Sequence, residues 1–170
     1  MARGSYLTKF GEMRMVAEYV QRTYPQGLVY MRLRLGALQP DVGPRDLAPD
    51  EMAMLGLFRR WADAVVVTQE ELIVVEASIR SDSGDPSKLV LYGRLVPLTP
   101  ELQEYRNRKL VLELVVAVED PAVSALAQEM GVRTRVYRPP WLPEYLAQLH
   151  RRERRPVQSR GLLESPAPEE

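Results

Sequence analysis

The sequence predicts an α/β fold with a mixed central sheet flanked by helices. Residues 63–67, 72–75 and 109–118 are apolar runs rich in valine, which is typical of strands covered on both faces. A helical pattern over 121–131 separates the third run from another strand at 132–137, so these last two strands should be parallel. With 170 residues and 45% hydrophobic side chains, the chain can bury a core of its own.

The N-terminal part of the chain predicts a helix and one strand. Over 7–24, apolar side chains recur at three- and four-residue steps until a proline and a glycine follow. Residues 28–35 alternate, which indicates a strand with one face on the core and one in water. On the open face, Tyr30, Arg32 and Arg34 are suited to holding a polyanion. The ordinary alternative is a solvated face or a subunit contact.

Turn and cap signals place the elements around the apolar runs. A loop rich in proline and glycine over 36–49 leads to a helix expected at 50–61. The polar residues 68–71 form a connection short enough for a hairpin. A polar loop at 80–87 precedes a helix expected at 87–96.

We expect one domain over residues 1–150. Its core lies at 50–137, and the helix and strand at 7–35 precede that core. A terminal helix with an apolar side is expected at 141–155. Residues 151–170 form a tail that is first basic and then rich in proline and glutamate, a composition typical of disorder.

Composition excludes several kinds of site. Because there is no cysteine, disulfides and thiolate metal sites are excluded. His150 is the only histidine, so no site can take two imidazoles from one chain. The net charge of zero argues against a whole surface that binds nucleic acid, but it allows a local basic groove. No apolar run is long enough for a membrane span and no secretory signal is evident, so we expect a cytoplasmic protein without membrane contact.

Two acidic residues lie in the predicted hairpin. Asp63 opens the first strand and Glu76 lies near the end of the second, so their carboxylates can meet at one edge of the sheet. Carboxylates that converge on Mg²⁺ allow the ion to polarise a phosphate and activate water. A nearby lysine can offset charge on the phosphate. Lys88 and Tyr92 follow at i and i+4 on the next predicted helix.

This arrangement resembles the PD-(D/E)XK nuclease superfamily. That family's restriction-endonuclease-like core has a helix, an antiparallel hairpin, a further strand, a helix and another strand, as expected here over 50–137. Asp63 stands at the first acidic position, after Ala62 instead of the usual proline, and Glu76 stands at the second. Ser78 occupies the position of the family's lysine.

The RecB-like branch of the superfamily has a Gln-x-x-x-Tyr pattern on the next helix, where this chain has Lys88 and Tyr92. The resemblance implies Mg²⁺-dependent cleavage of DNA, with Asp63 and Glu76 as metal ligands and Lys88 as the catalytic charge. It also implies residues that contact the nucleic acid, for which the candidates are Tyr92, Arg80 and Arg94. The family's extra acid on an upstream helix has three candidates, which are Glu12, Glu18 and Glu51.

Each of these residues also has an ordinary structural reading. Asp63 can take a turn hydrogen bond at the start of a strand. Glu76 can be exposed at the strand end or paired with Arg80. Tyr92 can pack in the core with its hydroxyl at the rim.

Two hypotheses about function therefore stand. The first is a nuclease-like protein that hydrolyses phosphodiesters of DNA with Mg²⁺, or a weakened form of one. The second is a non-catalytic assembly subunit, for example of a phage particle, that keeps the fold, binds protein partners or further copies of itself, and is found in the virion if phage-encoded. Ser78, the neutral net charge and the alternating strands favour the second. The surroundings of the two acids discriminate between them.

Overall fold

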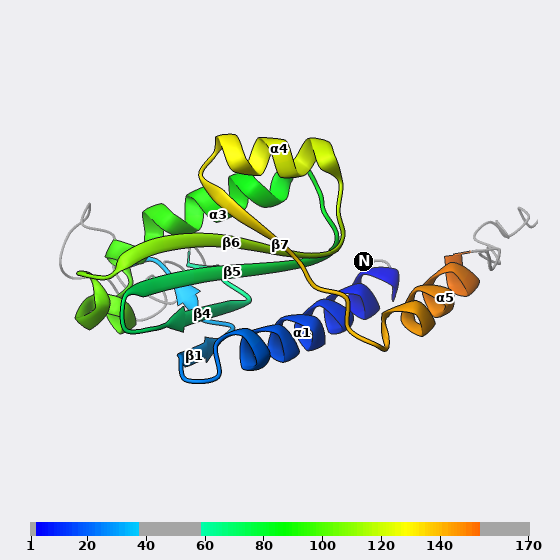
Figure 1. The fold of residues 1–170 in the computed structure, drawn as a ribbon, viewed down its shortest axis with the longest axis horizontal. Helices are drawn as coiled ribbons and strands as arrows, with labels where there is room; N and C mark the ends of the chain where they lie inside the picture. The colour runs from blue at the N-terminus through cyan, green and yellow to red at the C-terminus, as the bar shows by residue number, and fades with distance from the viewer. Residues whose placement is uncertain (1–2, 38–58, 154–170) are drawn as a thin grey trace, which may run out of the picture.

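A computed structural model describes residues 3–37 and 59–153 (Figure 1). Its main sheet has five strands in the order β1-β4-β5-β6-β7. β1, β4 and β5 are antiparallel neighbours, whereas β5, β6 and β7 run parallel. The predicted hairpin and the predicted parallel pair are confirmed. These strands are β1 (Leu28–Met31), β4 (Ala64–Val67), β5 (Glu71–Arg80), β6 (Lys109–Val118) and β7 (Val132–Val136).

Helices cover both faces of this sheet, as the apolar runs predict. α3 (Gly84–Leu95) and α4 (Pro121–Glu129) lie on one face, and α1 (Arg3–Thr23) lies on the other with the start of α5 (Leu142–Glu153) (Figure 1). Side chains of β5 alternate between two separate cores. Leu72 and Val74 pack under α3, and Ile73 and Val75 pack against α1. The α/β class with a mixed sheet between helices is therefore confirmed.

The expected single strand at 28–35 is wrong. The chain forms β1, breaks at Arg32 and continues as β2 (Arg34–Leu35), which pairs with β3 (Arg60–Trp61) in a separate two-stranded sheet. Arg32 has φ of 52°, a left-handed conformation that ends the extended run. The helix expected at 50–61 is also wrong at its end, because its last two residues are strand β3. The remainder of it, up to residue 58, lies outside the described residues.

The later elements begin and end close to their expected positions. α3 starts three residues before the expected 87, and two short 3₁₀ helices follow it, Val96–Leu98 and Pro100–Tyr105. α5 matches the expected terminal helix up to Glu153. The first three residues of the predicted tail, 151–153, belong to this helix, and the rest of the tail lies outside the described part of the chain. None of the described helices is long and apolar enough to span a membrane.

Candidate active site

The sheet opens on one side where β4 and β5 part. Their pairing begins with Ala64 opposite Val75, and β5 continues past this point without β4 beside it. Two carboxylates take the place of the missing strand. Asp63 Oδ2 accepts a hydrogen bond from the Ala77 N–H at 3.0 Å, and Glu12 Oε1 of α1 accepts one from the Ile79 N–H at 3.4 Å. The parting of the strands therefore collects acids at this edge.

Glu76 immediately precedes Ala77 on β5 and lies on the same face as Leu72 and Val74, toward α3. Its side chain is only 6% exposed. Lys88 reaches down from α3 and its ammonium contacts Glu76 Oε1, while the lysine side chain itself remains 45% exposed. The other oxygen, Oε2, is buried without a hydrogen-bond partner among the described residues. A buried carboxylate oxygen without a partner is uncommon, because its desolvation is not offset.

Burial, and after it the charge of neighbouring carboxylates, raises the pKa values of Glu76 and Glu12. Burial, together with the negative charge of Asp63, raises the pKa of Glu76 from 4.5 to about 8, although Lys88 opposes this. Burial raises the pKa of Glu12 to about 7, where Asp63 and Asp85 add to the effect. Burial alone would lower the pKa of Lys88, but Glu76 outweighs it and the net shift is upward. A further positive charge at this edge would therefore be bound favourably.

Ser78 does not supply that charge. Its side chain lies on the same face of β5 as Glu76, two residues on, and its hydroxyl donates to the Arg80 carbonyl at 2.5 Å. Arg80 is exposed, and its Nη2 lies 3.1 Å from His150 Nε2 on α5. The ordinary reading in which Glu76 is exposed or pairs with Arg80 is therefore wrong, since Lys88 is the partner of Glu76.

Tyr92 and Arg94 lie further along α3. Tyr92 is 3% exposed, packs in the core under α3 and donates its hydroxyl to the Trp61 carbonyl at 2.7 Å. Its ring centroid lies 5.7 Å from Lys88 Nζ. Arg94 is exposed in the last turn of the helix. Contacts of Tyr92, Arg80 and Arg94 with nucleic acid stay predictions.

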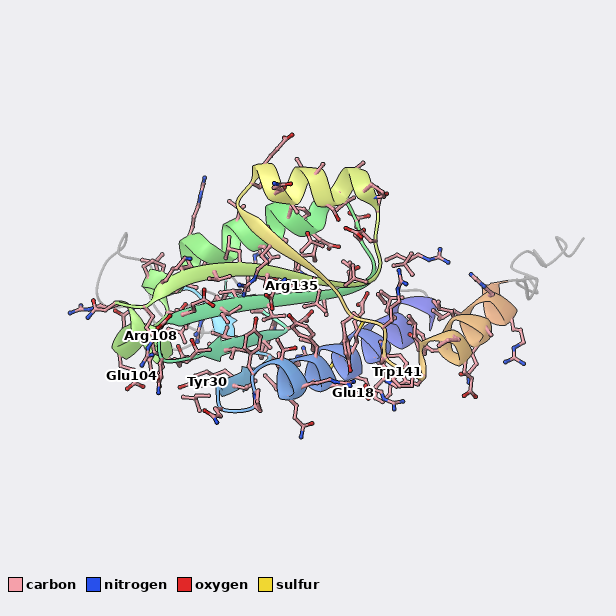
Figure 2. All side chains as sticks on the ribbon, in the orientation of Figure 1. Glu18, Tyr30, Glu104, Arg108, Arg135 and Trp141 are labelled. Carbon is pink, nitrogen blue, oxygen red and sulfur yellow. The ribbon has the colours of Figure 1, made fainter. Side chains whose placement is uncertain are left out.

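Of the three upstream acids, the structure brings Glu12 to the site. Glu18 points elsewhere, because it pairs with Arg14 at 2.9 Å and accepts from the Trp141 indole at 2.9 Å (Figure 2). Glu51 lies outside the described residues. Sequence reasoning missed Asp85, in the first turn of α3, whose charge acts on both Glu12 and Glu76. The sequence placed Asp85 in the loop before the expected helix, and an acid this close to a helix start was the available signal.

The residues fit a hard divalent cation held by few protein ligands. Within residues 3–37 and 59–153, no group of three or more acidic or histidine side chains is arranged to hold a metal. Mg²⁺ commonly uses one or two carboxylates and keeps several waters. The oxygen of Glu76 without a hydrogen-bond partner, next to the charge of Asp63, matches that need.

Stability should depend on pH through Glu76. Its pKa is higher in the folded protein than the ordinary 4.5, so the folded state holds this proton more tightly. The contribution of Glu76 to the free energy of unfolding is full below about pH 4.5 and should fall as the pH rises to 8, by roughly 5 kcal/mol. Urea unfolding of the wild type and Glu76→Gln in EDTA checks this. The free energy of unfolding of the variant should increase relative to that of the wild type as the pH rises. Parallel profiles of stability against pH would contradict the expectation. Glu70→Gln, in the exposed turn, is the control.

The geometry thus brings Asp63, Glu76, Lys88 and Glu12 to one opening of the sheet. Asp63 and Glu12 each accept a hydrogen bond from a backbone N–H there, and Glu76 forms an ion pair with Lys88. Neither the comparison with protein-family models nor the comparison with curated proteins finds a match for this chain.

Proposed function

We propose that this protein is a PD-(D/E)XK nuclease-like enzyme that hydrolyses phosphodiester bonds of DNA with a divalent cation. The observation that carries the proposal is Glu76, which is buried against the charge of Asp63 with one oxygen on Lys88 and the other without a hydrogen-bond partner. A carboxylate in this state is suited to receive a cation. Lys88 approaches the side of β5 on which the family's lysine is expected at Ser78.

Each residue has a role in this proposal. Asp63 and Glu76 would hold Mg²⁺, which would supply the charge that polarises the phosphate and lowers the barrier to attack by water. Lys88 keeps its charge at neutral pH and offsets charge that develops on the phosphate. Glu12, with a pKa of about 7, is matched to accept a proton from water near neutral pH. The proposed site of action is the cytoplasm.

The test is cleavage of plasmid and single-stranded DNA in Mg²⁺ and in Mn²⁺. We expect cleavage with either ion and none in EDTA. Lys88→Met should lower the rate by about 100-fold, the loss typical of removing one group that stabilises transition-state charge. Lys109→Met is the matched control, because Lys109 is exposed at the far end of the sheet and pairs in register with Glu71. The proposal would be refuted if the wild type were inactive or if the two lysine variants cleaved at equal rates.

A second candidate, the non-catalytic assembly subunit, is favoured by a different observation. The edge strand β1 exposes two large apolar side chains, Leu28 and Met31, at 50% and 41%. Exposed apolar side chains on an unpaired edge are suited to protein contacts. In that case the protein has protein partners or forms a homo-oligomer, and a phage-encoded copy is found in the virion. Mass measurement in solution checks this, because a monomer that captures no partner would count against it.

A further inference from the structure

The small sheet beside the acids carries a half-exposed aromatic ring with two arginine guanidinium groups over it. Trp61 on β3 is 46% exposed. The guanidinium carbon of Arg34 lies 4.8 Å from the centroid of its ring, and that of Arg32 lies 5.1 Å away. We call Arg32, Arg34 and Trp61 the Trp61 platform. The sequence predicted a polyanion surface here with Tyr30 as its aromatic residue, but Tyr30 is half-buried and its hydroxyl lies 3.3 Å from that of Tyr105.

Backbone contacts fix the shape of the Trp61 platform. Arg34 and Trp61 are cross-strand partners in the β2–β3 pair. Arg32 has a positive φ, which a non-glycine residue adopts only where neighbouring contacts hold it. Those contacts are hydrogen bonds from the Arg32 N–H to the Asp63 carbonyl at 2.8 Å and from the Ala62 N–H to the Leu33 carbonyl at 2.9 Å.

The same contacts join the Trp61 platform to the acids. Arg32 bonds directly to the backbone of Asp63, and Trp61 precedes Asp63 by two residues. From the other side, Tyr92 donates to the Trp61 carbonyl, one helical turn after Lys88. A strand of nucleic acid bound on the Trp61 platform therefore lies next to the edge that holds Glu76.

The chemistry of the Trp61 platform favours one occupant. Guanidinium groups bind phosphate, and an exposed indole stacks on a nucleobase. Arg60, also exposed, adds a third positive charge on β3. A base must be unstacked from its neighbours to lie on a protein ring, which single strands allow and an intact duplex does not.

We infer that the Trp61 platform binds single-stranded nucleic acid, with Arg32 and Arg34 on its phosphates and Trp61 against a base. The inference deepens the proposed function, because it names the form of the substrate and where it lies. Its direct consequence is binding, which does not require cleavage. Fluorescence anisotropy of a labelled oligothymidylate of about 12 nucleotides, measured in EDTA, therefore tests it without the proposed chemistry.

Three variants define the test. Trp61→Leu should weaken binding by about tenfold through loss of one stacked base. The double variant Arg32→Gln and Arg34→Gln should reduce the slope of log affinity against log salt by about 1.4, since each phosphate contact on a single strand contributes about 0.7. Arg22→Gln with Arg106→Gln removes the same charge from exposed positions elsewhere and should leave the slope within error of the wild type.

The outcomes separate this inference from the proposed function. Glu76→Gln should lose cleavage and keep oligonucleotide binding. If the wild type does not bind the oligonucleotide, binds a duplex of equal length as tightly, or binds equally after Trp61→Leu, the inference is overturned even where cleavage occurs. A dimer that dissociates in Trp61→Leu would also overturn it, by assigning this surface to a second copy. If Trp61→Leu does not fold, the slope of log affinity against log salt for the double arginine variant decides whether the inference holds.

Discussion

Glu76→Gln is expected to lower the rate of DNA cleavage by about 100-fold or more while leaving the fold intact. Glutamine has nearly the same volume as glutamate, so the space between β5 and α3 stays filled. The substitution removes the carboxyl group that contacts Lys88 and that would give up its proton, with a pKa of about 8, when the proposed cation binds. Loss of a group that acts on transition-state charge typically lowers a rate by this amount. Rates of cleavage of single-stranded DNA and of plasmid at saturating Mn²⁺ measure it.

Asp63→Asn tests the second proposed metal ligand. The asparagine oxygen can still accept the hydrogen bond of the Ala77 N–H that Asp63 Oδ2 accepts at 3.0 Å, so the local structure is kept while the charge is lost. We expect a similar loss of rate with a change in stability of less than about 1 kcal/mol. Glu129→Gln, at the exposed end of α4, is the matched control and should cleave at the wild-type rate. Undiminished cleavage in either acid variant would contradict the assignment.

The second large effect concerns stability and a different acid. Glu113→Ala is expected to lower the free energy of unfolding by about 3–5 kcal/mol. Glu113 is fully buried in β6 on the face that α1 covers. It accepts hydrogen bonds from the hydroxyls of Tyr19 at 2.8 Å and Tyr24 at 2.9 Å and from Arg133 Nε at 2.6 Å. Alanine leaves these donors without their acceptor, and a buried donor without a partner is unfavourable.

Urea unfolding at pH 7 measures this effect. Arg135→Ala is the control, because Arg135 lies 3.7 Å from the same carboxylate with 53% of its side chain exposed (Figure 2). Pairs of this kind contribute at most about 1 kcal/mol. Glu113→Gln should fall between the two, since it keeps one acceptor oxygen. If Glu113→Ala were no less stable than Arg135→Ala, the buried cluster would not contribute as described.

The fold could be predicted where local pattern and tertiary position agree. The apolar runs at 63–67, 72–75 and 109–118 contain strands of the main sheet because strands buried on two faces need apolar side chains throughout. The pattern failed at Arg32, where side-chain alternation continues although the backbone turns to a positive φ. It also failed at Trp61, whose pairing with Arg34 is a contact between distant parts of the chain.

The candidate site was predicted only where its residues follow from local sequence spacing. The spacing of Lys88 and Tyr92 on α3 was visible in the sequence, and Lys88 does contact Glu76. The choice of Glu12 over Glu18 was not visible, because it depends on which turn of α1 lies beside Ile79. Glu113 gave no local signal either, since nothing within an apolar run reveals that two tyrosines and an arginine will meet there.

The parting of β4 from β5 has a consequence for how sequences with this fold should be compared. Asp63 and Glu12 replace a missing strand by accepting backbone N–H groups, so selection for stability alone would retain them in an inactive descendant. Glu76 does not accept a backbone N–H in this way, since it faces α3 and pairs with the half-exposed side chain of Lys88. Active and inactive descendants should therefore be distinguished by whether they retain the pair Glu76 and Lys88. Retention of Asp63 does not distinguish them.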